Sequence, residues 1–544
     1  MLRVRGLGTV PYHEAFDLQH ALATGAGEDY LLILQHPHVY TLGAHADEAH
    51  VLVDPASVGA VLERTDRGGD VTYHGPGQLV AYPVVTVADD PSAGPAHVHR
   101  LEQVVMETLT DLGLDGACRV DEYPGVWVGA DGPDPRKIAA IGVRTVRTGA
   151  GRRRTLHGVA LNVDCDLSMF GHIVPCGIAD RGVTSLRAEG VEATMDEVVE
   201  VFVARAVAAF GDGAAERHDV VQGPAGVRIG PGSSPDPAER PLVRRLRQAG
   251  VAPEAGLEIT TRKPQWLRVP VRMGKEYRAL GSTIHDLGLV TVCEEAGCPN
   301  IYECWADGTA TFMINGDRCT RACGFCQVDT RHPLPLAPDE PERVARAVAR
   351  MHLGHAVVTC VARDDLPDGG AGAMAETIRA IREHAPGTTI EVLISDCKGD
   401  PRSLDAIFEA RPDVLNHNIE TVARLQRAVR PSAGYARSLA VLARAGAAGL
   451  VTKSGFMVGL GEREDEVVAT MADLHAVGVS IVTVGQYLRP SRDHLPVSRY
   501  WSPDEFSRLK AVGEELGLAH VESSPLTRSS YHAREAVSVV SAPH

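Results

Sequence analysis

The 544-residue sequence has no apolar run near the roughly 18 residues that a membrane-spanning helix needs. It has no excess of positive charge, because 54 Lys and Arg residues stand against 70 Asp and Glu residues, a net charge of −16. A general nucleic-acid-binding role therefore has no electrostatic support. The amino-terminal residues also lack the apolar core of a secretory signal. We expect a cytoplasmic protein that does not bind membranes or nucleic acid.

The sequence is not of low complexity either, since it contains 55 Gly and 34 Pro and is 44% hydrophobic and 23% charged, as in ordinary globular proteins. A length of about 150 residues per domain predicts two to four domains. The stretch 216–256 is rich in Gly, Pro and Ser and has no sustained apolar period. This composition favours a linker between one domain at 1–215 and another at 257–544, with a short helix around Val243–Gly250. A surface excursion within a single domain is the alternative.

Both parts of the chain are predicted to be α/β. The first mixes short apolar runs with helix-length stretches such as 99–112 and 195–210, which indicates a substantial sheet with helices. The second alternates more regularly, with apolar runs that include 356–360, 389–394 and 481–486 between amphipathic stretches. Repeated βα units predict a parallel sheet that is closed or partly closed into a barrel, with its chemistry at the strand ends.

Six of the eleven cysteines fall within the 34 residues from Cys293 to Cys326. Cys319, Cys323 and Cys326 form a C-x3-C-x2-C pattern, and Cys293, Cys298 and Cys304 form C-x4-C-x5-C. Disulfides are not expected in a cytoplasmic protein. Three thiolates on one loop can hold three irons of a 4Fe–4S cluster and leave the fourth iron open to a ligand. A zinc site is a competing interpretation, although two separate triplets fit paired zinc knuckles poorly. Buried structural thiols are the third.

The C-x3-C-x2-C pattern, with Phe325 before its last cysteine, resembles the radical S-adenosylmethionine superfamily. The flanking segments CEEAGCPNIYECW, GTATFMINGDRCTRACGFCQV, LNHNIETV, KSGFMVGLGE and RSSYHA narrow this resemblance to lipoyl synthases, over about residues 262–534. The resemblance implies a partial (β/α) barrel. It also implies S-adenosylmethionine bound to the cluster of Cys319, Cys323 and Cys326, and radical insertion of sulfur at C6 and C8 of a protein-bound octanoyl chain.

The resemblance further implies a second, auxiliary 4Fe–4S cluster that donates sulfur and is held by Cys293, Cys298 and Cys304. A serine of the RSSY motif would complete its ligands, and we assign this role to Ser530, with Ser529 as the alternative. An alkoxide suits a cluster that must be dismantled, since it binds iron less firmly than a thiolate. Asn418, Arg430 and Ser454 follow predicted strands and are weaker candidates for contacts with S-adenosylmethionine; structural roles are the alternative.

Four features of the first half also carry chemistry: the glycine-rich segment RGGDVTYHGPGQ at 67–78, Lys137 at the start of an apolar run, the strand HGVALNV at 157–163, and Cys176 between Pro175 and Gly177. A glycine-rich turn lets the backbone approach a ligand closely. Each feature alone has an ordinary structural interpretation, such as a hairpin, a lysine at a strand edge or a core cysteine.

Together and in this order they resemble lipoyl(octanoyl) transferases across roughly residues 1–210. The resemblance implies the fold of the lipoate and biotin ligases, with Cys176 as the nucleophile that takes octanoate from acyl carrier protein and Lys137 as the group that activates it. It also implies an acyl tunnel lined by Arg67, Gly68, Gly69, Asp70, Val71, Thr72, Tyr73, His74, Ala140, Ile141, Gly142, Gly158, Val159 and Ala160.

Two further segments of the first half deserve separate interpretation. The turn-rich segment GADGPDP at 129–135 departs from the transferase pattern and precedes Lys137, so it predicts a surface hairpin that could displace this lysine. The run Arg152–Arg154 is either a docking site for acidic carrier proteins or a solvated hairpin tip.

The two resemblances predict a bifunctional enzyme of lipoate biosynthesis, an acyltransferase followed by a sulfurtransferase. The expected protein partners are octanoyl-acyl carrier protein, the lipoyl domains of 2-oxoacid dehydrogenases, the glycine cleavage H protein, and an electron donor such as ferredoxin or flavodoxin. One alternative is that only the sulfur-insertion half is active and the first half is a binding scaffold. Another is that the first half is an ATP-dependent lipoate ligase, which needs no nucleophilic cysteine.

Overall fold

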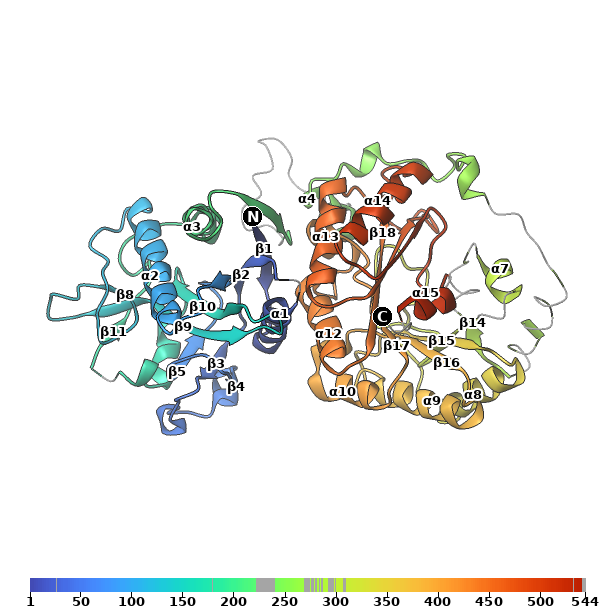
Figure 1. Cartoon of the computed structure of the whole chain (residues 1–544), viewed down its shortest axis with the longest axis horizontal. Helices are drawn as coiled ribbons and strands as arrows, with labels where there is room; N and C mark the ends of the chain where they lie inside the picture. The colour runs from blue at the N-terminus through green and yellow to red at the C-terminus, as the bar shows by residue number, and fades with distance from the viewer. Residues whose placement is uncertain are drawn as a thin grey trace. The chain divides into compact units, whose positions relative to one another are not determined.

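The computed structural model describes residues 1–221 apart from 26 and 179, residues 240–268, and residues 310–540 apart from 532. Between 268 and 310 it describes residues 274, 278, 281, 282, 284, 287–291, 298 and 300–306. The chain divides into two compact units, Met1–Arg228 and Ile229–His544, each with its own sheet and buried core (Figure 1). None of the described helices is both long enough and apolar enough to cross a membrane.

The first unit is built on a nine-stranded mixed sheet whose main path runs β11-β9-β10-β6-β2-β1-β12, with β7 and β8 paired to β10 and β9. Its strands are β1 (Leu2–Thr9), β2 (Asp29–Gln35), β6 (Gln78–Val84), β7 (Thr86–Val87), β8 (Gly125–Val128), β9 (Arg136–Arg147), β10 (Arg153–Asn162), β11 (Gly182–Val183) and β12 (Ala215–Asp219). A smaller sheet, in the order β4-β3-β5, consists of β3 (Val39–Leu42), β4 (Val61–Arg64) and β5 (Val71–His74). The fold is α/β, as predicted.

Helices α2 (Ala93–Asp111) and α3 (Met195–Phe210) supply apolar side chains to the core of the large sheet, among them Leu101, Val105 and Phe202. Helix α1 (Tyr12–Thr24) lies against β6 and β10 and contributes aromatic rings around His74 and His157. A second core beneath the small sheet contains Val71 and Tyr73. The polar residues of β5, Thr72 and His74, therefore face the long hairpin that β9 and β10 form.

The second unit carries an eight-stranded sheet in sequential order: β13 (Val290–Thr291), β14 (Ala310–Ile314), β15 (His355–Cys360), β16 (Thr389–Leu393), β17 (Val414–Asn416), β18 (Val451–Val458), β19 (Ile481–Gln486) and β20 (His520–Ser524). Strands β14 to β20 are parallel, and β13 is antiparallel to β14. Since β13 and β20 are the two ends of this order among the described strands, the barrel is partial. This agrees with the predicted fold.

The described α-helices of this unit are α4 (Pro241–Gln248), α7 (Ile301–Ala306), α8 (Glu340–Arg350), α9 (Ala371–His384), α10 (Pro401–Glu409), α11 (Gln426–Val429), α12 (Tyr435–Ala447), α13 (Glu464–Ala476), α14 (Pro503–Glu515) and α15 (Ala533–Val540). Helices α8 to α10 and α12 to α14 lie around the outside of the strands, whereas α15 is seen within the ring that they form (Figure 1). The parallel arrangement gathers the carboxyl ends of the strands at one end of the barrel, where the following loops meet.

Two parts of the stretch 216–256, predicted as linker, form regular elements. Residues 216–219 belong to β12, which pairs in parallel with β1, and residues 241–248 form α4 of the second unit. Composition does not reveal β12, because this strand exists only through its pairing with β1, the first strand of the chain. Residues 222–239 lie outside the described part of the chain.

Candidate functional sites

A cavity of about 460 Å³ lies in the first unit, a size within the range of small-molecule pockets. Twelve of the fourteen residues predicted for the acyl tunnel line it: Arg67, Gly68, Gly69, Asp70, Thr72, His74, Ala140, Ile141, Gly142, Gly158, Val159 and Ala160. The other two, Val71 and Tyr73, do not. Because side chains alternate along a strand, those of β5 at these two positions point into the second core instead. The tunnel assignment of Val71 and Tyr73 was therefore wrong.

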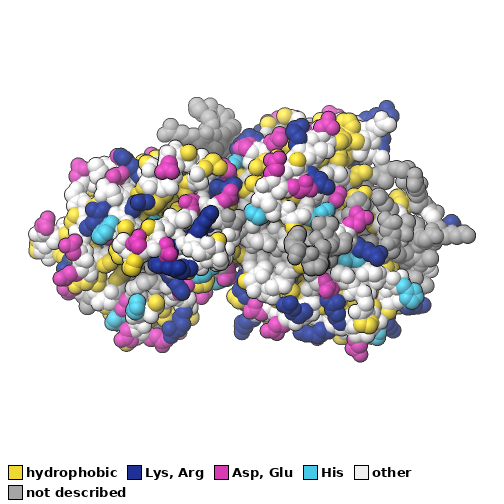
Figure 2. Space-filling model, viewed as in Figure 1, with side chains coloured by type: hydrophobic (Ala, Val, Ile, Leu, Met, Phe, Trp, Pro, Cys, Tyr) yellow, Lys and Arg dark blue, Asp and Glu magenta, His cyan; other side chains and the backbone are white. Residues whose placement is uncertain are grey.

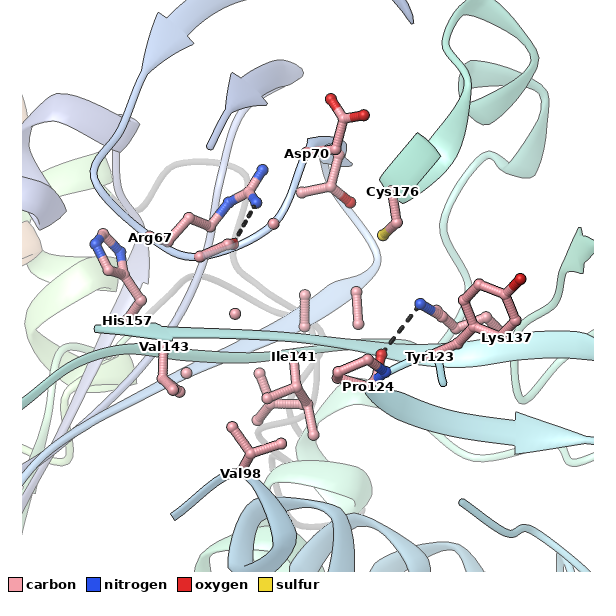
Figure 3. A pocket seen from close by; sticks show the side chains of 18 of the residues that line it. Arg67, Asp70, Val98, Tyr123, Pro124, Lys137, Ile141, Val143, His157 and Cys176 are labelled. Carbon is pink, nitrogen blue, oxygen red and sulfur yellow. Dashed lines mark hydrogen bonds between the residues drawn. The ribbon is translucent and has the colours of Figure 1, made fainter. Parts of the chain in front are cut away.

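Cys176 lies in a short turn, and its backbone has φ +55°, a left-handed conformation that is costly for a residue other than glycine. Gly177 follows with φ +70°. In Figure 3 the Cys176 thiol points into the cavity, while Val98, Ile141 and Val143 form an apolar wall on another side. A half-buried thiol at the edge of an apolar pocket is the arrangement that a covalent acyl carrier requires.

Lys137 lines the same cavity from β9. Its Nζ donates a hydrogen bond to the carbonyl oxygen of Pro124 at 3.1 Å and lies 4.7 Å from the centre of the Trp127 ring. No ion pair holds this ammonium group among the described residues. The structure thus brings the two predicted catalytic residues to one cavity, with the lysine oriented by a carbonyl and an aromatic ring.

The segment 129–135 is the turn between β8 and β9, as its composition predicted. The antiparallel pairing places Trp127 opposite Lys137, so the ladder fixes the lysine in spite of the insertion.

The prediction for Arg152–Arg154 is only partly compatible with the structure. Arg154 is fully buried and donates to the carbonyl oxygen of Val84 at 2.8 Å, so this side chain is not available for docking.

The structure also identifies residues around Cys176 that the sequence did not single out. His50 Nδ1 lies 2.5 Å from Asp70 Oδ2, and the His50 carbonyl oxygen accepts a hydrogen bond from the Val174 amide at 2.8 Å. A Cβ atom at Gly177 would lie 2.9 Å from Asp70 Oδ2, so the turn packs directly against this carboxylate. The pair therefore supports the strained turn from behind. An isolated histidine in an otherwise unremarkable segment carries no signal for this role.

Arg67 lies in the wall of the cavity with its guanidinium group buried. It donates to the Thr41 carbonyl oxygen at 2.7 Å and to Thr41 Oγ1 at 2.8 Å, and its Nε has no hydrogen-bond partner among the described residues. Burial lowers the pKa of Arg67. A cation without a carboxylate partner, next to the cavity, is suited to a polar oxygen of a ligand.

His157 adopts φ +60°, is buried, and lines the cavity. Its Nε2 lies 2.6 Å from Asp66 Oδ1, and the same carboxylate contacts His20 at 3.0 Å and Arg144. Burial alone would raise the pKa of Asp66, but hydrogen bonds from His157 and His20 hold it well below its usual value. This ionised carboxylate fixes the orientation of His157.

A second cavity, of about 950 Å³, lies in the second unit at the carboxyl ends of the barrel strands. Cys326 and Phe325 of the cysteine loop line it, and so do Cys298, Ser529 and Ser530. The two cysteine-rich segments and the RSSY segment, far apart in sequence, thus meet at one cavity. Cys304 is among the described residues but does not line this cavity, and Cys293 lies outside the described residues.

The cysteine loop 319–326 is held from several sides. The Arg321 guanidinium pairs with Asp364 at 2.8 Å and with the buried Asp396 at 2.6 Å. The Gly324 amide donates to the Val429 carbonyl oxygen at 2.8 Å, and His494 Nε2 lies 2.9 Å from the Cys326 carbonyl oxygen. These contacts anchor the loop to the segments that follow β15 and β16, to the end of α11, and to the loop after β19.

The thiols of this loop fit a shared metal cluster. Burial raises the pKa of Cys323 to about 12 and that of Cys326 to about 11, and the neighbouring thiols of the loop add to both shifts. Among the described residues no three His, Cys, Asp or Glu side chains are placed to hold one metal ion. A four-iron cluster makes a different demand, because each thiolate binds its own iron and the thiols stay apart. Buried thiols that disfavour each other's ionisation are stabilised as thiolates by such a cluster.

The two serines of the RSSY segment have different partners. Ser530 Oγ accepts a hydrogen bond from Thr311 Oγ1 at 3.0 Å, and Ser529 Oγ accepts one from Asn418 Nδ2 at 2.7 Å. Arg528 is half-buried, and desolvation lowers its pKa while the Cys298 thiol raises it. A cation here would favour the thiolate form of Cys298.

The catalytic-domain model of the lipoyl protein ligases A and B matches residues 11–206. The model of the radical SAM superfamily matches residues 313–474, and the model of the N-terminal domain of lipoyl synthase matches residues 251–298. Lipoyl synthase of Rubrobacter xylanophilus is 58% identical over 275 residues, which are 50% of this chain and 86% of that protein. The chain belongs to the lipoyl synthase family. Lipoyl synthase of Mycobacterium avium is 56% identical over 272 residues, 50% of this chain and 89% of the relative.

A solved structure is similar to the first half. It is a bi-partite lipoate protein ligase from Thermoplasma acidophilum, described with its E2 lipoyl domain, with 19% identity, a TM-score of 0.34, and coverage of 40% of this chain and 86% of that one. The lipoyl synthase relatives cover only half of the present chain, so its ligase- or transferase-like domain is an addition to the lipoyl synthase region. The predicted composite of the two families is confirmed.

Of the three weaker candidates in the lipoyl synthase half, only Asn418 lines the second cavity. Ser454 is fully buried and accepts a hydrogen bond from the Ile419 amide, and Arg430 Nη1 donates to the Asn418 carbonyl oxygen at 2.8 Å. Both stand behind the loop that carries Asn418 and support it. They are not in contact with the cavity, because their polar groups turn toward backbone.

Glu420 is a residue of this cavity that sequence reasoning missed. It has φ +67°, accepts a hydrogen bond from Asn418 Nδ2 at 3.1 Å, and burial raises its pKa. The sequence offers one signal for it: Glu420 lies two residues after Asn418 in the segment that follows β17. A carboxylate and an amide side by side can bind paired hydroxyl groups of a ligand.

Proposed function

We propose that the chain carries out two successive steps of lipoate synthesis: octanoyl transfer in its first half and insertion of two sulfur atoms in its second. The second step rests on family membership. The first rests on one observation, the presence of Cys176 and Lys137 at the same cavity with an apolar wall. Octanoyl-acyl carrier protein would supply the acyl group, and a lysine of a lipoyl domain or of the H protein would receive it.

The first half would act through a thioester on Cys176. The Cys176 thiolate attacks the carbonyl carbon of the carrier thioester, and the sulfur of the carrier arm leaves as a thiol after taking up a proton. Lys137, whose Nζ donates to the Pro124 carbonyl oxygen, would move that proton. The neutral amine of the acceptor lysine then attacks the carbonyl carbon of the enzyme thioester, and the bond to the Cys176 sulfur breaks. The proton that the amine loses passes to this sulfur, and an amide remains. Val98, Ile141 and Val143 would hold the alkyl chain away from water.

In the second half, residues Cys319, Cys323 and Cys326 would hold the cluster that chelates S-adenosylmethionine, with Asn418 and Glu420 beside it in the cavity. Cys293, Cys298, Cys304 and Ser530 would hold the auxiliary cluster. When bound, these groups supply the radical that breaks unactivated C–H bonds and the sulfur that replaces the hydrogens. The side chains of the protein orient the ligands: Arg321 anchors the cysteine loop, and Asn418 links Glu420 to Ser529.

The decisive experiment for the first half uses the full chain with Cys176→Ala and the wild type as a pair. With octanoyl-acyl carrier protein, the wild type should gain the mass of one octanoyl group on Cys176, and the variant should gain none and transfer none to a lipoyl domain. Full transfer by the variant only when ATP and free octanoate are supplied would show an ATP-dependent ligase instead. Lack of transfer by both proteins, with S-adenosylmethionine cleavage intact, would show a binding scaffold.

A further inference from the structure

Helix α4 is unusually basic for this chain. The segment 240–247 has four arginines and no acidic residue, whereas the protein as a whole has a net charge of −16. On the face shown in Figure 2, basic and acidic side chains are interspersed. Arg240, Arg244 and Arg247 are exposed. The helix precedes residue 251, where the lipoyl synthase N-terminal model begins, and it follows the ligase-like region.

The apolar side of α4 packs beside the cysteine loop of the radical site. A Cβ atom at Gly324 would lie 2.8 Å from a methyl carbon of Leu242 and 2.8 Å from one of Leu495. Gly324 stands between Cys323 and Cys326, so only a glycine lets α4 approach this closely. The helix also packs on α11, whose Val429 carbonyl oxygen binds the Gly324 amide. Arg424 donates to the Ala249 carbonyl oxygen at the end of α4 and fixes the helix there.

Further arginines surround the helix. Arg427 on α11 and Arg492 in the loop after β19 are exposed. Arg240 Nη2 donates to the Arg492 carbonyl oxygen at 3.1 Å, which joins this loop to the start of α4. Together we name Arg240, Arg244, Arg245, Arg427 and Arg492 the arginine patch. Among the described residues, the acidic side chain paired with it is Asp493, 3.5 Å from Arg240 and 91% exposed.

The positive charges of the patch are poorly compensated. Arg244, Arg427 and Arg492 have no ion pair with any described residue. Burial lowers the pKa of Arg245, and repulsion from Arg427 and Arg244 lowers it further. One nitrogen of Arg245 is buried without a hydrogen-bond partner in the described part of the chain. Arginines that repel one another in a strongly acidic protein are stabilised when an acidic surface covers them.

We propose that the arginine patch is the docking surface for an acidic protein that carries one electron to the radical site. This inference rests on the proposed radical function of the second half. An electron donor needs the shortest path to the cysteine loop and no opening in the protein, and α4 contacts this loop from outside. The carrier loses one electron and the cluster gains it, and no bond forms or breaks in this transfer.

An acidic lipoyl domain is a less suitable occupant. Its octanoyl arm must enter the second cavity, and none of the residues of α4 lines that cavity. The residues of the patch on α4 therefore lie beside the cysteine loop and outside the lining of this cavity, whereas Pro490, two residues before Arg492, lines it. This separation would let a carrier and a lipoyl domain bind at the same time.

The test compares two double variants of the full chain with equal changes in charge. The patch variant is Arg244→Glu with Arg427→Glu, and the matched control is Arg346→Glu with Arg350→Glu on the exposed side of α8. The first readout is the dissociation constant of oxidised flavodoxin at low ionic strength, measured by calorimetry. We expect the patch variant to bind about tenfold more weakly and the control to bind nearly as the wild type does. Salt should weaken wild-type binding toward the value of the patch variant.

The second readout is S-adenosylmethionine cleavage with either reduced flavodoxin or dithionite as reductant. The patch variant should be slow with flavodoxin and as fast as wild type with dithionite, which needs no docking. Equal weakening of flavodoxin binding by both variants, or none by either, would overturn the proposal. Loss of lipoyl-domain binding with flavodoxin binding intact would also overturn it. Absence of cleavage in the wild type with dithionite would refute the radical function instead, and the binding data would remain decisive for the patch.

Discussion

The support behind Cys176 allows a quantitative prediction for Asp70→Ala. The Asp70 carboxylate accepts hydrogen bonds from the Val71 amide at 2.7 Å, from the Asp47 amide at 3.2 Å and from His50 at 2.5 Å. Hydrogen bonds to a charged group contribute about 1.5 to 3 kcal/mol each, and left-handed backbone at a non-glycine residue costs about 1 to 3 kcal/mol. Removal of the carboxylate therefore loses a stabilising free energy at least as large as the cost of the left-handed backbone at Cys176.

We expect the turn to relax and the thiol to leave its position above the cavity. A displacement of about 1 Å at a reacting group can cost about 100-fold in rate, so acyl-enzyme formation should fall by about this factor. In Figure 3 the Asp70 carboxylate points away from the Cys176 sulfur, so the effect should come through position and not through the charge on sulfur.

The assay is single-turnover formation of the octanoyl thioester on Cys176, followed by mass spectrometry, with thermal unfolding measured in parallel. Asp70→Asn is the conservative variant, since it keeps an oxygen that accepts the two amide hydrogen bonds, and it should recover much of the rate. His50→Gln, which keeps a donor toward Asp70, should also lose less than Asp70→Ala. If Asp70→Ala folds and forms the thioester at the wild-type rate, the proposed support of the turn is refuted.

Three further predictions concern the second half. Lys453 Nζ donates to Glu391 at 2.9 Å, and both side chains are buried in the barrel, so Lys453→Met should destabilise the unit by about 3 to 5 kcal/mol in urea unfolding. Adding Glu391→Leu should recover most of this loss, and a double variant as unstable as Lys453→Met would contradict the prediction. Burial would raise the pKa of Glu391, but Lys453 and His355 lower it to about 2. The ionised carboxylate should therefore contribute its full stabilising free energy above its unfolded pKa of about 4.5 and lose it as pH falls toward 2, which urea unfolding measured at a series of acidic pH values would check. After anaerobic purification, about eight irons per wild-type chain and about four for Cys298→Ala are expected from iron analysis; four in the wild type would exclude the auxiliary site as assigned.

The sequence alone determined the chemistry that is local in the chain. Three thiols within eight residues identify the cysteine loop, because a loop of this length can present them to one cluster without help from distant residues. Cys176 between Pro175 and Gly177 is similarly local, since these neighbours fix the turn that presents the thiol. The fold class followed from the alternation of apolar runs, which reflects the period of strands and helices. The division between the two units lies within the predicted linker 216–256, but β12 at the start of that stretch was not foreseen, because it pairs with a strand more than 200 residues away.

The tertiary structure decided every feature that depends on which face of a strand a side chain occupies and which distant residues it contacts. It separated Thr72, in the first cavity, from Val71 and Tyr73 in a core, because only strand pairing sets the face of each residue. It placed Ser529 and Cys298 at one cavity although 231 positions separate them. It also revealed His50 behind the nucleophile, a role that arises from contacts across the fold and leaves no pattern in the neighbouring sequence. Reactive residues at short spacings can be recognised in a sequence, whereas the residues that support and orient them are brought together only when distant segments of the chain fold against each other.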